Sequence, residues 1–145
     1  MKVEQIDHIH IVVKDLDKAV EFFESLLGVK FSKEVFLEEW QFKSRIAPIG
    51  PVGIELMQPT SPDSVFAKFI ERRGEGLQAI SLKVPDIEEA KAEMEARGIR
   101  LVSAVEVGRM KEAQFHPKDA YGVLIELCQY QAVHPGIAAC FEKGE

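Results

Sequence analysis

The sequence has little of several features that mark specialised protein classes. It contains only two cysteines, Cys128 and Cys140, which are too few for a disulfide framework and favour a reducing compartment. Lysine and arginine number 18 against 24 aspartates and glutamates, and the net charge of −6 argues against broad binding to nucleic acid or to an anionic membrane. No apolar run approaches the length of a membrane span, and the N-terminus lacks the apolar region of a signal peptide. We therefore expect a cytoplasmic protein.

What the sequence does contain is enough apolar material for one core. Hydrophobic residues make up 46% of the 145 residues and charged residues 29%, which is ordinary for a globular protein and unlike a disordered one. A chain of this length can bury a core without disulfide or metal staples. We therefore expect residues 1–145 to form a single domain.

An internal repeat organises that domain. Residues 6–16 align with residues 77–87 at an offset of 71 positions, and the same offset relates residues 54–56 to residues 125–127. Each copy begins with an alternating β-branched strand, passes an aspartate and a helical stretch that ends in glycine, and closes with further strands. The pattern predicts an α+β fold of two βαβββ modules. The expected parts are a first module over 1–58, a linker helix over 59–75, a second module over 76–130 and a C-terminal tail over 131–145.

Capping residues and apolar spacing place the individual elements. Asp15 and Asp86 are expected to cap helices, and Gly28 and Gly98 suit the left-handed position just past a helix end. The apolar stripes between these positions are Leu16, Ala19, Val20, Phe23 and Leu27 in the first copy and Ile87, Ala90 and Met94 in the second. A short connecting helix is expected from Val65 to Arg73. Strands are expected over 29–37, 40–48, 51–58, 99–105, 109–116 and 122–130.

Strand alternation assigns the polar side chains to faces. His8 and His10 share one face of the first strand, opposite Ile9 and Ile11. By the same alternation, Glu55 lies opposite Ile54 and Leu56, and Glu126 lies opposite Ile125 and Leu127. We expect the uniformly apolar faces to carry the helices. The faces with histidine and glutamate should then line an open, barrel-like cavity.

Together these segments resemble the vicinal oxygen chelate superfamily (glyoxalase, bleomycin resistance and dioxygenase proteins), over nearly the whole chain. The resemblance is strongest to the methylmalonyl-CoA epimerase branch. It rests on the opening Asp7-His8 with alternating apolar residues, on residues 54–64, on residues 66–77, and on the terminal His116-Pro117-Lys118-Asp119 with residues 122–127.

The resemblance implies a metal site and a reaction. The family places a divalent metal in its cavity, and its epimerases move a proton on and off the carbon alpha to a thioester. His8, Glu55 and Glu126 occupy three of the four ligand positions, and Glu126 or Glu55 is implied as the proton-transferring residue. The fourth ligand, a histidine in the family, is replaced by Ala79. A nitrogen and oxygen donor set suits Co, Ni, Zn or Mn.

Further residues are expected around the cavity, and His10 is the most open to interpretation. It can serve as a substitute ligand, as a base or as a side chain that narrows the pocket. His116 is expected in a turn or at the mouth of the pocket. The predicted substrate-pocket residues are His10, Gln78, Ala79, Ser81, Met57 and Cys128.

Three other interpretations stay open. The two glutamates can pair with Lys43, Arg45 or Lys83 in a structural network without metal, because unpaired buried carboxylates are costly. The cavity can belong to a metal-free binding protein of the bleomycin-resistance type, which Ala79 favours, or to a glyoxalase-type lyase. Dioxygenase chemistry is disfavoured, since it needs two histidines and a carboxylate on one iron. The expected partners are a small-molecule substrate of the acyl-CoA class and a second copy of the chain in a homodimer.

Overall fold

The computed structural model describes residues 1–131 and divides them into two compact units. One unit contains residues 1–8 and 79–131, and the other contains residues 9–78. The boundaries fall inside two strands, β1 (Gln5–Val12) and β5 (Gly76–Lys83). One unit is therefore a continuous segment, and the other joins the first half of β1 to the second copy of the repeat. The predicted turn at residues 134–136, the apolar segment 137–141 and Cys140 lie outside the described residues.

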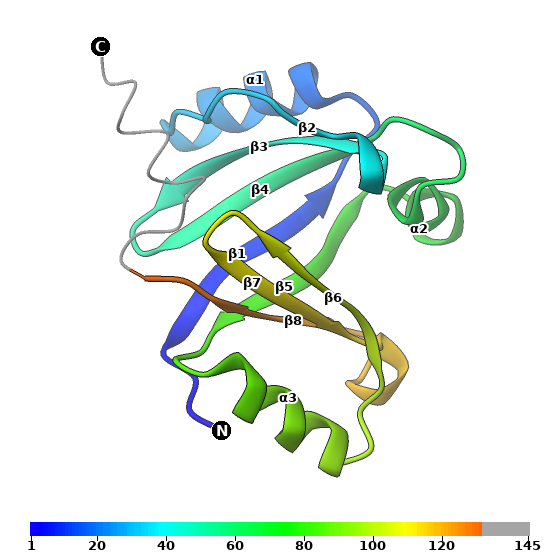
Figure 1. The fold of residues 1–145 in the computed structure, drawn as a ribbon. Helices are drawn as coiled ribbons and strands as arrows, with labels where there is room; N and C mark the ends of the chain where they lie inside the picture. Colours follow the sequence, from blue (N-terminus) through cyan, green and yellow to red (C-terminus); the bar gives the residue numbers. More distant parts are fainter. Residues whose placement is uncertain (132–145) are drawn as a thin grey trace. The chain divides into compact units, whose positions relative to one another are not determined.

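The unit of residues 9–78 builds its sheet from the second half of β1 and three further strands. They run in the order β2 (Val35–Leu37), β3 (Phe42–Ile49), β4 (Val52–Pro59) and β1, and β3 pairs antiparallel with both β2 and β4. Helix α1 (Leu16–Leu27) lies along this sheet (Figure 1). A 3₁₀ turn, η1 (Glu38–Trp40), and helix α2 (Val65–Arg73) complete the unit.

The unit of residues 1–8 and 79–131 repeats the plan. Its strands follow the order β1, β5, β8 (Leu124–Gln129), β7 (Met110–Phe115) and β6 (Leu101–Val107), with β5 and β8 parallel and β7 antiparallel to both neighbours. Helix α3 (Ile87–Ala96) lies beside this sheet (Figure 1). A 3₁₀ turn, η2 (Pro117–Asp119), links β7 to β8. The two βαβββ modules of the predicted α+β fold are confirmed.

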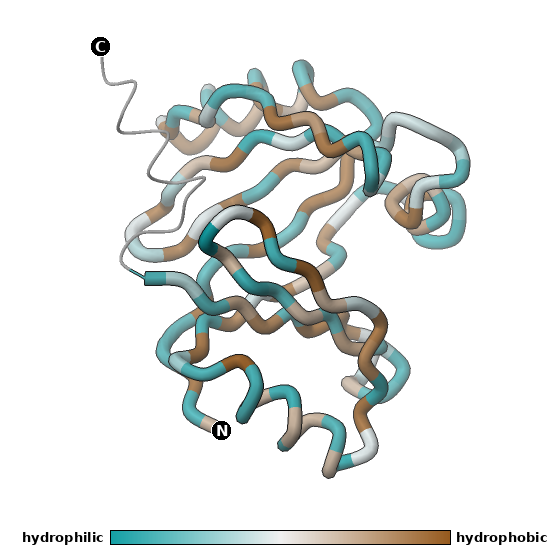
Figure 2. The backbone as a smooth tube through the Cα atoms, viewed as in Figure 1, coloured by the Kyte–Doolittle hydropathy of each residue, from teal (hydrophilic) through white to brown (hydrophobic). Residues whose placement is uncertain are grey.

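Each unit buries its helix against the apolar face of its own sheet, as the alternation predicts. Hydrophobic and hydrophilic residues alternate along the strands (Figure 2). Leu16 and Val20 of α1 pack with Leu56, and Ile87 and Met94 of α3 pack with Leu127 in the other unit. Fully burying one such side chain stabilises the fold by roughly 1.5–3 kcal/mol.

The repeat extends to individual hydrogen bonds. Asp15 accepts from the backbone N–H of Lys18 at 3.1 Å, and its repeat partner Asp86 accepts from Glu89 at the same distance. A second pair of bonds also matches at the offset of 71. The side-chain oxygen of Gln58 accepts the N–H of Leu16, and that of Gln129 accepts the N–H of Ile87, both at 2.8 Å. Both predicted aspartate caps are therefore confirmed.

Two local predictions are wrong. The strand predicted over 29–37 is limited to Val35–Leu37. The preceding residues have a backbone bond to β3, from the N–H of Ser32 to the Ile46 carbonyl at 2.7 Å, and are held otherwise largely by side-chain bonds. Phe31 donates its N–H to the Glu24 carboxylate at 2.9 Å, and the Ser32 hydroxyl accepts the N–H of Ile46 at 3.0 Å. Leu27, predicted in the buried stripe of α1, is 42% exposed, since the core cluster of this unit includes Leu16 and Val20 but not the last turn of the helix.

The helix ends agree with the prediction. Gly28 and Gly98 have φ values of 66° and 80°, a left-handed conformation that side chains rarely adopt. The connecting helix runs from Val65 to Arg73 as expected, capped by the Ser64 hydroxyl. None of the described helices is long and apolar enough to cross a membrane.

Candidate functional site

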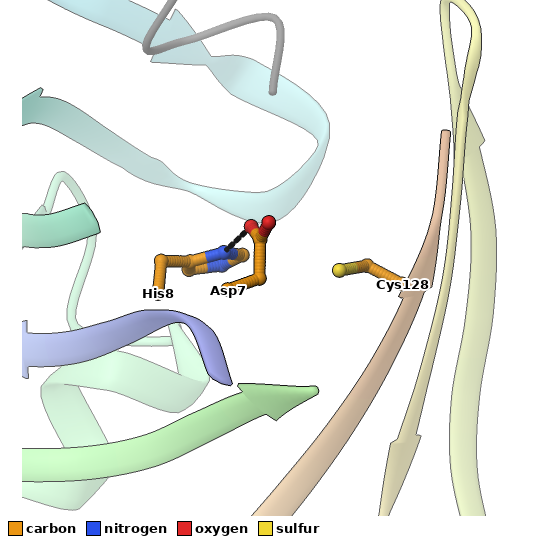
Figure 3. A group of neighbouring side chains, drawn as sticks. All are labelled: Asp7, His8 and Cys128. Carbon is orange, nitrogen blue, oxygen red and sulfur yellow. Dashed lines mark hydrogen bonds and ion pairs between the residues drawn. The ribbon is translucent and has the colours of Figure 1, made fainter. Parts of the chain in front are cut away.

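His8 is the centre of a buried polar network in the unit of residues 1–8 and 79–131. It lies on β1 with 1% of its surface exposed. Its Nδ1 is 2.7 Å from Asp7 Oδ2, and its Nε2 is 3.2 Å from Glu126 Oε1. Figure 3 shows the imidazole against the Asp7 carboxylate, with Cys128 pointing toward both from β8. Both ring nitrogens of His8 thus face carboxylate oxygens.

This geometry needs a proton or a metal ion between His8 Nε2 and Glu126 Oε1. A neutral imidazole that donates Nδ1–H to Asp7 presents a lone pair at Nε2, and a lone pair repels an ionised Glu126 oxygen. The contact becomes favourable when either atom carries a proton or when the nitrogen and the oxygen are ligands of one metal ion. Carboxylate-held histidines are the usual ligands of protein metal sites, since the carboxylate fixes the tautomer.

Glu126 is held by a residue that the sequence analysis missed. Gln114 on β7 donates its amide Nε2–H to Glu126 Oε2 at 2.6 Å, and the Ser103 hydroxyl bonds the Gln114 carbonyl oxygen. Gln114 and Glu126 are register partners on antiparallel strands. Strand alternation could have identified Gln114 from the sequence, because it places Glu112 and Gln114 on the face of β7 opposite the buried Ala113 and Phe115.

Asp7 connects His8 to the end of β8. Its second carboxylate oxygen accepts the Tyr130 hydroxyl, and the Lys83 ammonium lies 4.3 Å from the centre of the Tyr130 ring. Burial and the bond to Asp7 raise the pKa of Tyr130, so the phenol remains a donor at neutral pH. Asp7 is therefore fixed from both sides.

Cys128 lies beside this network as a neutral thiol. It is fully buried, and burial followed by the nearby Asp7 carboxylate raises the pKa of its thiol. A thiol in such surroundings is a poor nucleophile, because the reactive form is the thiolate. Cys128 therefore acts as wall rather than as an attacking group.

Two groups of side chains in this unit have the donor types and spacing of a metal site. One is Asp7, His8 and Cys128, and the other is His8, Glu112 and Glu126; in each, the ligand atoms lie within 4.8 Å of one another. The second group offers one imidazole nitrogen and two carboxylate oxygens, which suits Co, Ni, Zn or Mn. The residues present therefore fit the metal that the resemblance implies.

The unit of residues 9–78 holds the other predicted glutamate. Glu55 lies on β4, half-buried, with Oε1 at 3.5 Å from the Nε2 of His10, which is itself buried. The structure thus places a histidine–glutamate pair in each unit: His8 with Glu126, and His10 with Glu55. That His8, Glu55 and Glu126 share one ion stays a prediction.

The other predicted pocket residues occupy mixed surroundings. Met57 is buried in an apolar cluster with Phe42 and Phe66. Gln78 is half-buried on β5, with its side-chain oxygen shielded from solvent. Ala79 and Ser81 follow on β5 in the other unit, both almost fully buried, and Ser81 is the register partner of Glu126.

Two of the three basic residues proposed as structural partners, Lys43 and Arg45, have other contacts. Lys43 pairs with Glu34 at 3.7 Å, and Arg45 donates to the Ser32 carbonyl at 2.7 Å. His116 caps η2, with its Nδ1 accepting the N–H of Lys118 at 3.1 Å. Its predicted role in a turn is confirmed.

Several of the relatives found by comparison with known proteins are methylmalonyl-CoA epimerases. The chain is 34% identical to the mitochondrial methylmalonyl-CoA epimerase of Homo sapiens over 86% of this chain and 73% of that protein. The crystal structure of methylmalonyl-CoA epimerase from Mycobacterium tuberculosis superposes with a TM-score of 0.81 at 34% identity, covering 94% of this chain and 93% of that one. A methylmalonyl-CoA epimerase in complex with methylmalonyl-CoA and NH4+ gives a TM-score of 0.84 at 29% identity, covering 92% and 99% of the two chains.

The family match itself covers residues 7–116 and so includes most of both repeats. It agrees with the fold and with the resemblance found in the sequence. This chain belongs to the glyoxalase/bleomycin resistance protein/dioxygenase superfamily.

Proposed function

We propose that this chain is a metal-assisted epimerase that moves a proton at the carbon alpha to an acyl-CoA thioester. The observation that carries the proposal is the buried His8–Glu126 contact at 3.2 Å, because a metal ion bound by both ligand atoms would make this contact favourable. The similarity to methylmalonyl-CoA epimerases supports an epimerase-like enzyme and an acyl-CoA substrate. Cysteine content and the resemblance support a cytoplasmic homodimer.

In this proposal His8, Glu55 and Glu126 hold the metal. When bound, the metal supplies Lewis-acid polarisation of a carbonyl oxygen. Asp7 keeps His8 in the tautomer that presents Nε2, and Gln114 fixes one oxygen of Glu126. The ligand atoms are thereby aligned before substrate arrives, which lowers the cost of ordering them.

The two glutamates carry the proton. One carboxylate accepts the alpha proton, so the C–H bond breaks, an O–H bond forms and the electron pair enters the enolate. Transfer of a proton from the second carboxyl group, which begins the cycle as the carboxylic acid on the opposite face of that carbon, forms the C–H bond with inverted configuration and leaves this group as a carboxylate. Glu126 and Glu55 are the proposed pair, and general acid–base catalysis of this kind contributes about 10²–10⁴-fold.

The test is exchange of the alpha hydrogen in D₂O. Proton NMR of a methylmalonyl thioester should show loss of the alpha signal with the wild-type protein and added Co²⁺ or Mn²⁺. Glu126→Gln and Glu55→Gln should each slow the exchange by about 10²-fold or more. Glu106→Gln, a change to an exposed glutamate on β6, is the matched control and should leave the rate unaltered. Equal rates with and without protein would reject the proposal.

A metal-free binding protein is the second candidate, and one observation favours it. The position equivalent to His8 in the repeat is Ala79, so one ligand of the family's set is missing. A proton on His8 Nε2 would also satisfy the contact with Glu126. This candidate predicts that acyl-CoA raises the melting temperature equally with and without chelator, and that no alpha exchange occurs.

A further inference from the structure

A side chain outside the predicted ligand set lies at the His8–Glu126 contact. Glu112 is on β7, half-buried, two positions before Gln114 on the same strand face. Its register partner on β8 is Cys128, two positions after Glu126 on the same face. One carboxylate oxygen of Glu112 lies within 4.8 Å of the ligand atoms of both His8 and Glu126.

The second ligand atoms of the pair are already committed to positioning bonds. His8 uses Nδ1 for Asp7, and Glu126 uses Oε2 for Gln114. The atoms left facing each other are His8 Nε2 and Glu126 Oε1, and the Glu112 carboxylate adds a third donor. In a typical metal ligand, one atom of the side chain makes a hydrogen bond that fixes its orientation, and another atom binds the metal. His8 and Glu126 have this arrangement.

The Glu112 carboxylate adds a second carboxyl group to the surroundings of His8 and Glu126. Carboxylates gathered in a buried site are stabilised by a cation among them. A divalent ion between Glu112, Glu126 and His8 would be such a cation, in a region that also contains the Lys83 ammonium beside the Tyr130 ring.

A buried hydroxyl on the neighbouring strand points the same way. Ser81 on β5 is fully buried and is the register partner of Glu126, so the two side chains share a sheet face. Among residues 1–131 its hydroxyl has no nitrogen or oxygen partner, and its partner is the Cys128 thiol, which is a weak hydrogen-bonding group. A hydroxyl on the same sheet face as Glu126 can also bond a water molecule held by an ion.

We propose that His8, Glu112 and Glu126 form a divalent-cation site in which the Glu112 carboxylate takes over the ligand role that Ala79 cannot fill. The inference rests on the proposed function, because the ion is the one that the epimerase would use. All three ligands lie in the unit of residues 1–8 and 79–131. Exchange of an imidazole for a carboxylate makes the donor set harder, which favours Mn²⁺ relative to Zn²⁺.

The experiment measures metal binding directly. Purified full-length protein is stripped with chelator, dialysed and titrated with Mn²⁺, Co²⁺ and Zn²⁺ by isothermal calorimetry. Wild type should bind one ion per chain, and Glu112→Gln should weaken Mn²⁺ and Co²⁺ binding by about tenfold or more. Glu106→Gln is the matched control and should bind as wild type does. Glu112→His should restore binding with the preference moved toward Zn²⁺, which a purely structural role of Glu112 would not produce.

Two outcomes would overturn the inference. One is wild-type affinity in Glu112→Gln, and the other is no binding to the wild type at millimolar metal. The first outcome leaves the proposed function open, because the D₂O exchange measures it separately. The second would also reject a metal-assisted epimerase. If the protein catalyses alpha-hydrogen exchange but its metal affinity is unchanged in Glu112→Gln, the epimerase proposal is supported and this metal site is rejected. Tight binding through Glu112 without exchange would keep the site and reject the epimerase.

Discussion

Asp119 accepts three hydrogen bonds from a single residue, Arg100. The backbone N–H, Nε and Nη2 of Arg100 lie 3.0, 2.8 and 3.1 Å from its carboxylate oxygens. These bonds join the turn η2, which precedes β8, to the start of β6. The side-chain bonds first, and then the backbone bond, lower the pKa of Asp119 from 3.8 to about 2.

A carboxyl whose pKa falls on folding stabilises the protein only when it is ionised. The contribution of Asp119 should be fully present above pH 4 and should be lost as the pH falls from about 4 to about 2. Because the pair is exposed, the effect should be small and should shrink with added salt.

We therefore expect Arg100→Ala to be less stable than wild type at pH 6 and to approach wild type near pH 2. Urea unfolding at several pH values measures this difference. Arg109→Ala, at an exposed arginine before β7, is the control and should show no such convergence. A difference that stays constant from pH 6 to pH 2 would contradict the assignment.

At the scale of elements, the two βαβββ modules share a way of starting their helices. Asp15 and Asp86 could be predicted as caps, because a cap and its helix are neighbours in the sequence. The bonds from Gln58 and Gln129 could not, since each glutamine lies 42 residues from the N–H that it accepts. Glu112 was missed for the same reason, because its importance comes from the adjacent strand β8.

Removing these glutamine bonds should destabilise each helix by a similar amount. Gln58→Ala and Gln129→Ala should each lower the free energy of unfolding by about 1 kcal/mol, since each leaves an N–H of the first turn without its acceptor. Urea denaturation measures the loss. The two effects should add in the double variant, because the bonds share no residue. Gln131→Ala, at an exposed position, is the control, and an effect as large as that of Gln129→Ala would point to something other than the helix bond.

For the whole molecule, the repeat accounts for what the sequence could predict. The offset of 71 predicted the modules, the helix caps Asp15 and Asp86, and Glu55 and Glu126 as equivalent positions. The prediction of a strand over 29–37 was wrong because residues 30–34 alternate poorly and bond largely through side chains, those of Glu24 and Ser32 among them. Family resemblance supplied His8 and Glu126, which the structure brings to 3.2 Å. The partners that orient them, Asp7 and Gln114, required the coordinates.

Repeat equivalence also predicts how the missing ligand can be restored. Ala79 is the counterpart of His8 and lies in the same unit. Ala79→His should tighten Co²⁺ binding by about tenfold and should rescue binding in the Glu112→Gln background. Because Ala79 is buried, the larger side chain should cost about 1–3 kcal/mol of stability. Calorimetry and thermal melting measure the two effects. Unchanged affinity in Ala79→His, combined with loss of metal in His10→Ala, would show that His10 already fills the position.

The His8–Glu126 pair joins two residues of one unit that are 118 positions apart in the sequence, the difference between 126 and 8. On a translating ribosome Glu126 therefore follows His8 after an interval on the order of ten seconds at ordinary elongation rates. During this time the nascent chain carries one partner without the other. The proposed metal ion would therefore bind only after both residues have been synthesised.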